Sequence, residues 1–218
     1  MRTRAVFLDR DGVINPYVCH PEFGTVDSPA RATEFSLFQG VGEAINRLNR
    51  LGLLVVVASN QPGIAKRKFT LSHLNAVTAK MRSSVESAGG KIDAVYYCQH
   101  HPDSLLPIYR KNCECRKPKP GLLLMAANDW KIDIPRSYTV GDGVADILAG
   151  AAVRTTTIFV SARKCYVCDE LAHHGAKPDF IVRDLWEAST VIDCLENGDT
   201  AATRAYCFSD GCLSAKLP

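Results

Sequence analysis

Two aspartates follow the first apolar run of the chain, with one residue between them. The run Ala5 to Leu8 leads into Asp9, Arg10, Asp11 and Gly12. Residues two apart on a strand share a face, so a turn after this run can bring both carboxylates to one point. Carboxylate oxygens are ligands that Mg²⁺ prefers. The pattern D-x-D-G also occurs in calcium loops and simple turns, but its place at the end of an apolar run favours a magnesium site.

A second group combines soft metal ligands with positive charge. The four ligands Cys98, His100, Cys113 and Cys115 are followed at once by Arg116 and Lys117. This pattern could belong to a nucleic-acid-binding zinc finger, to a catalytic metal centre, or to a loop that a metal ion fixes in place to hold an anion. Four protein ligands close a tetrahedral zinc site and leave no position for water, so we favour structural zinc over catalytic zinc or no metal. The segment also lacks the recognition helix of a nucleic-acid finger.

Polar residues end two further apolar runs. Ser59 and Asn60 follow the run 53–58, where a hydroxyl and backbone N–H groups can receive a phosphate oxygen, although Ser-Asn is also an ordinary turn or helix cap. Asp142 follows the run 138–140. Asp146 comes four residues later, and it either orients a neighbouring group or is a carboxylate at the start of a helix.

Elements that alternate along the chain must position these residues. Apolar runs predict strands, and amphipathic stretches between them predict helices. This alternation indicates an α/β fold with a parallel sheet and helices on both faces, in which ligands bind beyond the carboxyl ends of the strands. We expect one domain at 1–197, a loosely held tail at 198–218 and a long loop at 16–31 that covers the site. The predicted strands are 5–8, 53–58, 94–97, 138–140 and 156–160, and the predicted helices are 41–51, 71–88, 121–130 and 144–152.

Composition limits the possible classes of function. The 218 residues carry a net charge of +3, which argues against a dedicated nucleic-acid binder. The sequence has no apolar window long enough to span a membrane and no signal peptide, so we expect a cytoplasmic protein. Nine cysteines in such a chain favour metal ligands or buried thiols over a disulfide framework. Two pairs, Cys165 with Cys168 near His173 and His174, and Cys207 with Cys212, remain without an assigned role.

The motifs taken in order resemble those of the haloacid dehalogenase superfamily of phosphohydrolases. The family pattern is DxD, then Ser or Thr, then Lys, then GDxxxD, and its four parts occur here from about residue 4 to 196. The resemblance implies a Rossmann-like parallel sheet without a large cap domain, with the loop at 16–31 and a zinc-bearing loop covering the site. One departure stands out, because Gly143 occupies a position that is usually lysine in that family.

The resemblance also implies roles for these residues. Asp9 would attack phosphorus and form an aspartyl-phosphate, and Asp11 would act as acid and then as base. The carboxylates of Asp9 and Asp142 would bind Mg²⁺ together with the backbone carbonyl of Asp11. The remaining candidates would contact the substrate: Ser59, Asn60 and Lys117 at the phosphoryl group, and Arg116 at a second phosphate or a sugar oxygen.

Three further stretches, SNQ-GIA, YYC-HHP and C-CRKP-PG, are similar to the heptose 1,7-bisphosphate 7-phosphatases within this superfamily. Histidinol-phosphate phosphatases share the layout, but twelve residues separate His100 from Cys113, which matches the heptose type. This similarity implies a monomer that acts on a small sugar phosphate, with no nucleic-acid or membrane partner. The alternatives are another small phosphomonoester, a phosphotransferase that uses the same Asp9 intermediate, and a zinc-stabilised binding module.

Overall fold

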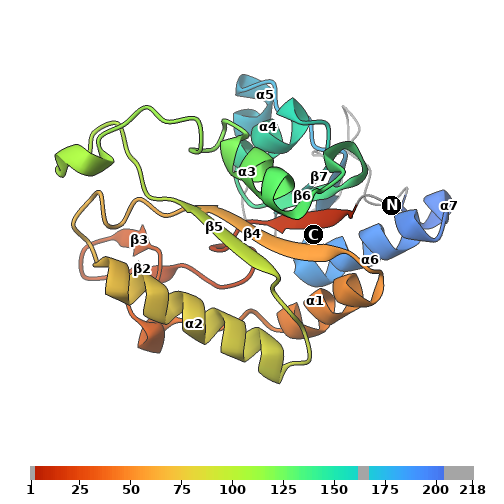
Figure 1. Ribbon diagram of the computed structural model, residues 1–218, viewed down its shortest axis with the longest axis horizontal. Helices are drawn as coiled ribbons and strands as arrows, with labels where there is room; N and C mark the ends of the chain where they lie inside the picture. The colour runs from red at the N-terminus through yellow and green to blue at the C-terminus, as the bar shows by residue number, and fades with distance from the viewer. Residues whose placement is uncertain (1–2, 162–166, 204–218) are drawn as a thin grey trace.

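The computed structural model describes residues 3–161 and 167–203, which form a six-stranded parallel sheet covered by helices (Figure 1). The strands lie in the order β5-β4-β1-β6-β7-β8, so the chain builds outward from β1 on one side and then on the other. Such a reversal opens a crevice at the carboxyl ends of the central strands. The strands are β1 Ala5–Leu8, β4 Leu54–Asn60, β5 Ala94–Cys98, β6 Tyr138–Gly141, β7 Thr156–Val160 and β8 Phe180–Val182.

The central strands are buried on both faces, as their continuous apolar character predicts. Val6 and Leu8 of β1 belong to one core with apolar residues of α1, α2 and α6. Ala5 and Phe7 alternate with them and belong to the opposite core, which α3 covers. Helices therefore lie on both faces, as expected (Figure 1). The helices are α1 Val41–Arg50, α2 Leu71–Ser87, α3 Gly121–Trp130, α4 Val144–Ala152, α5 Val167–His173, α6 Leu185–Glu196 and α7 Thr200–Thr203.

The predicted strands and helices all occur, with shifts of one or two residues at some ends. The main sheet and its helices also include β8, α5, α6 and α7, which the sequence analysis does not predict. A strand of three residues is too short to show a period, which explains why β8 escapes prediction. Three short 3-10 helices complete the regular structure: η1 Ala32–Glu34, η2 Pro107–Tyr109 and η3 Ile134–Arg136.

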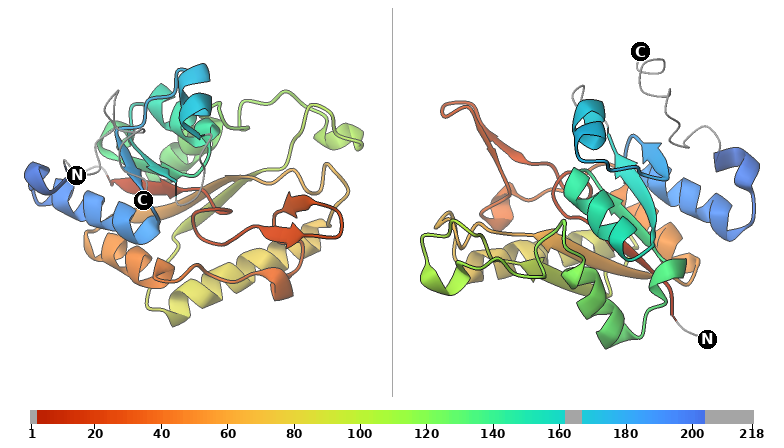
Figure 2. Two further views of the ribbon diagram at one scale, coloured as in Figure 1. Left: turned by 180° about the vertical axis from the view of Figure 1, so that it is seen from behind. Right: turned by 90° about the horizontal axis from the view of Figure 1, so that it is seen from above.

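The segment 16–31, expected to be an irregular loop, forms an antiparallel hairpin. β2 Val18–His20 pairs with β3 Thr25–Asp27, and Val18 lies opposite Asp27. The prediction of an irregular loop was wrong because strands this short show no alternation in the sequence. Figure 2 shows the hairpin standing away from the main sheet, beside the chain that follows β4.

A second insertion joins β5 to α3 and carries η2 (Figure 1). Within the described residues, neither this segment nor the hairpin builds a further domain. No helix in residues 3–161 and 167–203 has the length and apolar character needed to cross a membrane. The boundary between a domain at 1–197 and a tail at 198–218 stays a prediction, since most of the tail lies outside the described residues.

Candidate active site

Asp9 stands directly after β1, at the crevice where the strand order reverses. Its N–H donates to the carbonyl of Val140 at 3.0 Å, which anchors it to β6. Its Oδ1 accepts a hydrogen bond from the N–H of Arg10 at 2.8 Å and lies 3.1 Å from Nζ of Lys117. Among the described residues, Oδ2 has no such partner. One oxygen is therefore held in place, and the other is open to react with a bound group.

Lys117 is a buried cation at the centre of the site. Its Nζ donates to the carbonyl of Ala58 at 2.7 Å and forms ion pairs with Asp9 and Asp146. Burial lowers the pKa of Lys117, but the carboxylates of Asp146 and Asp9 raise it by more, so the pKa lies above its ordinary value. The amine stays protonated at neutral pH and can stabilise negative charge that develops beside Asp9.

Three carboxylates meet beside this lysine. Oxygen atoms of Asp9, Asp142 and Asp146 all lie within 4.8 Å of one another. Gly12 permits this approach, because its φ is +84° and a Cβ there would lie 2.2 Å from Oδ2 of Asp142. Carboxylate oxygens at this spacing fit a hard divalent cation such as Mg²⁺. The three residues are called the acidic trio below.

Asp146 contacts Lys117 and also stands in the first turn of α4, so its position is compatible with both roles that the sequence left open. Its Oδ1 pairs with Lys117, and its Oδ2 accepts a hydrogen bond from the N–H of Gly143 at 3.0 Å. Burial raises the pKa of Asp146 against the opposing charge of Lys117. Gly143, which carries no side chain where the family usually has lysine, thus contributes its backbone N–H to the first turn of α4.

Asp11 has a different environment from the acidic trio. Four side chains donate hydrogen bonds to its carboxylate: Arg10 at 3.0 and 3.1 Å, Asn15 at 2.9 Å, Ser28 at 2.8 Å and Gln61 at 2.7 Å. The sequence analysis assigned no role to any of these four. A charged residue between two acids at the end of an apolar strand is the one signal that could have identified Arg10.

Ser59 and Asn60 are the last two residues of β4, and their side chains make different contacts. Ser59 is buried, and its Oγ accepts a hydrogen bond from Nε2 of Gln61 at 3.1 Å. The Asn60 side chain pairs with the backbone of Lys117, accepting from its N–H at 3.1 Å and donating to its carbonyl at 3.0 Å. Asn60 therefore holds the loop that carries the lysine, so its amide group is engaged by protein.

The four predicted zinc ligands converge. Their sulfur atoms lie 3.2 to 3.5 Å from one another, and Nδ1 of His100 lies 3.4 Å from the nearest sulfur, that of Cys115. These separations exceed a disulfide bond of about 2.05 Å. They approach the edge of roughly 3.7 Å in a tetrahedron with Zn–S bonds near 2.3 Å. The donor set Cys98, His100, Cys113 and Cys115 therefore fits a zinc ion.

The basic turn is tied to this cluster of ligands. Arg116 is half-buried, and its Nη1 donates to the backbone carbonyl of His100 at 3.2 Å. The ligand cluster and the turn with Arg116 and Lys117 thus form one unit.

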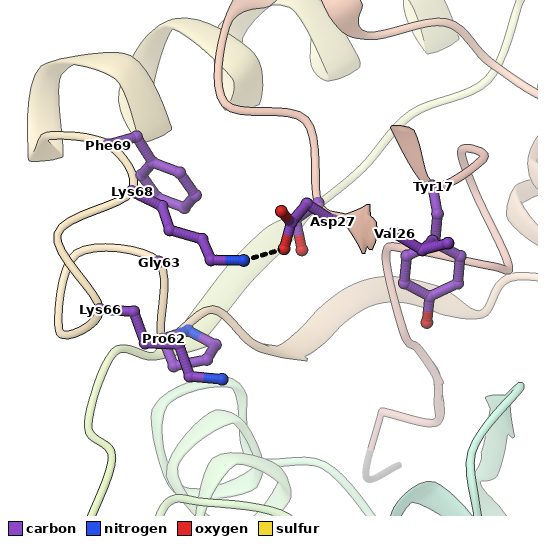
Figure 3. Close-up of a pocket in the computed structure, with 9 residues that line it drawn as sticks. Tyr17, Val26, Asp27, Pro62, Gly63, Lys66, Lys68 and Phe69 are labelled. Carbon is purple, nitrogen blue, oxygen red and sulfur yellow. Dashed lines mark hydrogen bonds and ion pairs between the residues drawn. The ribbon is translucent and has the colours of Figure 1, made fainter. Parts of the chain in front are cut away.

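A pocket adjoins the site between the hairpin and the segment after β4. It has a volume of about 150 Å³, and Figure 3 shows Lys66 and Lys68 on one side and Tyr17 on the other. Lys68 forms an ion pair with Asp27 of the hairpin. A neighbouring cavity of about 300 Å³ shares Asp27 and Lys68 with it. The segment 16–31, expected to cover the site, therefore lines a pocket beside it.

Two hydrogen bonds connect this pocket to the acids. The Tyr17 hydroxyl donates to Oδ2 of Asp142 at 3.3 Å, and the Ser28 hydroxyl donates to Oδ2 of Asp11 at 2.8 Å. Burial raises the pKa of Tyr17, and the negative charge of Asp142 raises it further, so the phenol stays neutral. A molecule in the pocket would meet hydroxyl groups on the hairpin before it meets the carboxylates.

The remaining cysteine motifs fall largely outside the described residues. These include Cys165, Cys207, Cys212 and the side chain of Cys168. His173 and His174 lie at the end of α5, with ring centroids 5.0 Å apart. The described residues hold no further group of His, Cys, Asp and Glu at metal-binding spacing beyond the acidic trio and the zinc-ligand cluster.

This chain is similar to a known enzyme family and to curated phosphatases. The family model described as HAD-hydrolase-like matches residues 114–188, which include the basic turn, Asp142 and Asp146. The D-glycero-beta-D-manno-heptose-1,7-bisphosphate 7-phosphatases of Yersinia pestis and Escherichia coli (strain K12) are each 39% identical to this chain over 153 residues. The match covers 70% of this chain and 77% and 76% of those relatives.

Solved structures agree with the sequence relatives. The D,D-heptose 1,7-bisphosphate phosphatase from B. bronchiseptica, complexed with magnesium and phosphate, is 29% identical with a TM-score of 0.71. The alignment covers 87% of this chain and 98% of that one. The two chains therefore share their fold over almost their whole described length.

Proposed function

This chain belongs to the haloacid dehalogenase-like phosphatases, and on that premise we propose that it removes the 7-phosphate of D-glycero-D-manno-heptose 1,7-bisphosphate. This reaction would serve the synthesis of heptose for surface glycans such as lipopolysaccharide. The observation that carries the proposal is the buried ion pair of Lys117 with Asp9, a member of the acidic trio. A pocket with two further lysines adjoins this site through Tyr17 and Ser28. Relatives that are 39% identical bear the name of this activity.

The residues support a two-step transfer through the protein. In the first step Oδ2 of Asp9 attacks phosphorus, the bond from phosphorus to the sugar oxygen breaks, and Asp11 gives its proton to that oxygen. In the second step water attacks the aspartyl-phosphate, Asp11 takes the proton of the water, and inorganic phosphate leaves with the Asp9 carboxylate restored. Lys117 and Ser59 would hold the phosphoryl oxygens while charge develops on them.

Magnesium fits this proposal because the acidic trio offers hard oxygen ligands. Asp9 and Asp142 would hold it with the backbone carbonyl of Asp11, and Asp146 lies within the same cluster. A bound Mg²⁺ would offset the repulsion between the attacking carboxylate and the phosphate. The solved relative that contains magnesium and phosphate is consistent with this assignment.

Zinc would have a structural role at Cys98, His100, Cys113 and Cys115. Four protein ligands leave no open position for substrate, so the ion would not take part in the reaction. It would hold the loop from which Arg116 and Lys117 project. The hydrogen bond from Arg116 to the carbonyl of His100 links the ligand cluster to that basic turn.

The pocket supports a substrate with two phosphates. Lys66 is exposed on its wall, and Lys68 balances only the single carboxylate of Asp27. A second phosphate bound there would interact with both lysines, while the first is held beside Asp9. Arg116 remains a second candidate for the same contact. A substrate with one phosphate, such as histidinol phosphate, would leave both lysines without a phosphate to bind.

A phosphate-release panel tests the proposal. The purified protein with Mg²⁺ would be assayed against both anomers of heptose 1,7-bisphosphate, histidinol phosphate and nucleotides. We expect the highest kcat/KM with a heptose bisphosphate and loss of the 7-phosphate, which NMR of the product would identify. Equal or better turnover of histidinol phosphate would replace the substrate assignment, and transfer of the phosphoryl group to an added alcohol instead of water would identify a phosphotransferase.

Two further expectations accompany the proposed function. The cytoplasmic location and the monomeric state that the sequence predicts remain predictions. Binding to nucleic acid, which would mark the alternative of a zinc-stabilised binding module, should be weak and should not compete with substrate.

A further inference from the structure

The donors around Asp11 differ in burial. Arg10, Asn15 and Gln61 are fully buried, with 0% of their surface exposed, whereas Ser28 is half-buried and lines the pocket. Three donors therefore hold the carboxylate from the protein interior. The Ser28 hydroxyl alone among these donors reaches Asp11 from the side of the pocket.

Arg10 and Gln61 also bind each other. Nη2 of Arg10 donates to Oε1 of Gln61 at 2.9 Å, while Nε2 of Gln61 donates to Oδ2 of Asp11 at 2.7 Å. Arg10 completes the ring through its own contacts with Asp11 at 3.0 and 3.1 Å. The guanidinium also lies over the Tyr97 ring, 5.6 Å from its centroid, which limits its rotation. The three polar side chains form a closed ring in which none can rotate alone.

The ring fixes the orientation of the Asp11 carboxylate as well as compensating its negative charge. The buried donors make four hydrogen bonds to Asp11, two to each oxygen, and the pocket-lining hydroxyl of Ser28 makes a fifth, to Oδ2. Because a carboxylate has about four lone-pair sites, a molecule that approaches Oδ2 from the pocket must take the place of the Ser28 hydroxyl. The ring therefore determines which side of Asp11 exchanges a proton with a bound molecule.

We propose that Arg10 and Gln61 are positioning residues, which hold Asp11 so that its Oδ2 meets the oxygen of the leaving group on the Ser28 side of the pocket. The inference rests on the proposed phosphatase function and on Asp11 as its acid and base. When the bond from phosphorus to the leaving oxygen breaks, its electron pair stays on that oxygen, which takes the proton from Asp11. A carboxyl group that turned away would leave an alkoxide, which is a poor leaving group.

The dependence on the leaving group separates this role from a structural one. A sugar alkoxide needs the proton, whereas p-nitrophenolate leaves without it. The variant Gln61→Met keeps the approximate size of the side chain and removes the hydrogen bonds to Asp11, Arg10 and Ser59. Thr157→Val is a matched control, because Thr157 is buried in β7 and its hydroxyl donates to Asp179 at 2.9 Å, away from the site.

The experiment compares both leaving groups in both variants. For Gln61→Met we expect kcat with a sugar phosphate to fall at least about tenfold, with KM nearly unchanged, because general acid catalysis is worth 10² or more. The first burst of p-nitrophenolate from p-nitrophenyl phosphate should keep its rate. Slower release of the following molecules is expected, since Asp11 also acts as the base in the second step. Thr157→Val should keep the activity with both substrates, even if its Tm falls by as much as the Tm of Gln61→Met.

Two results would overturn the inference. One is an equal fall of the sugar-phosphate rate and the p-nitrophenolate burst in Gln61→Met, which would show a general structural defect. The other is unchanged kcat with the sugar phosphate. Arg10→Lys gives a second variant that keeps the buried charge but loses the paired contacts with Asp11, and the same selective loss is expected.

Failure of the proposed substrate can be told apart from failure of this inference. If wild-type protein does not act on heptose 1,7-bisphosphate, the comparison is made with whichever alkyl phosphate of the panel it does hydrolyse. The burst with p-nitrophenyl phosphate reports Asp9 chemistry in either case. Only the difference between the two leaving groups decides whether Arg10 and Gln61 position Asp11.

Discussion

Nζ of Lys117 lies 3.1 Å from Oδ1 of Asp9, although one residue follows the first strand and the other sits in the loop after the zinc ligands. The same amine pairs with Asp146 on α4 and donates to Ala58 on β4. One buried cation therefore joins the ends of β1 and β4 to the start of α4. This relationship is the basis of the first two predictions.

Replacing the nucleophile should stop turnover. Asp9→Asn keeps the shape of the side chain, but its amide cannot attack phosphorus, so we expect kcat to fall at least about 10³-fold. The fold should persist, as judged by an unchanged circular dichroism spectrum and Tm near that of the wild type. Substantial residual phosphate release with this variant would contradict the assignment of Asp9.

Removing the buried cation should affect both stability and activity. Lys117→Met leaves Asp146 buried without its partner, which we expect to destabilise the fold by about 3 kcal/mol in urea unfolding. The double variant Lys117→Met with Asp146→Asn removes the unpaired charge and should recover part of that stability, but not the phosphatase activity. Equal stability of the two variants would show that the pair is not coupled.

Gly12 should be needed for the cation site. Gly12→Ala would place a Cβ 2.2 Å from Oδ2 of Asp142 at a φ of +84°, so Asp142 must move. We expect the Mg²⁺ concentration for half-maximal activity to rise about tenfold or more, as for other changes beside metal ligands. Gly24→Ala is the control, because its φ is also positive but no atom lies within 4 Å of the added Cβ.

Loss of one zinc ligand should release the metal. In Cys113→Ser we expect zinc content to fall, together with a lower Tm and a higher KM, because the loop that carries Lys117 loses its anchor. Cys19→Ser changes an exposed free cysteine and should leave all three quantities unchanged. Zinc content equal to the wild type in Cys113→Ser, measured by mass spectrometry, would exclude the proposed ligand set.

Lys66 should contribute to recognition of the second phosphate. Lys66→Met removes an exposed positive charge from the pocket wall, so we expect KM for the bisphosphate to rise about tenfold, the value of one charged hydrogen bond. The KM for a monophosphate should change little. Lys80→Met, on the exposed face of α2, controls for the change in net charge. Equal effects on both substrates would place the second phosphate elsewhere.

The order of strands and helices, and most of the candidate chemical groups, could be predicted from the amino-acid sequence alone. Continuous apolar runs predict buried parallel strands, and the carboxyl ends of such strands meet at one edge, so Asp9, Ser59 and Asp142 had to lie near each other. The spacing of the four soft ligands indicated a zinc site directly. The structure brings Asp9 and Asp142 together and gathers the four soft ligands into one cluster. Both juxtapositions could be predicted because they depend on local periodicity and on short separations along the chain.

The partners of each charged group, in contrast, became known from the folded arrangement. The pairing of Lys117 with Asp146, the ring of Arg10, Gln61 and Asp11, and the hairpin that lines the pocket all join segments far apart in the sequence. The packing of β1, β4 and α4 determines which buried charges lie close to one another. An ion pair between distant segments produces no periodic pattern in the sequence, so it could not be predicted there. Position in the fold, more than residue type, therefore assigns these groups their roles.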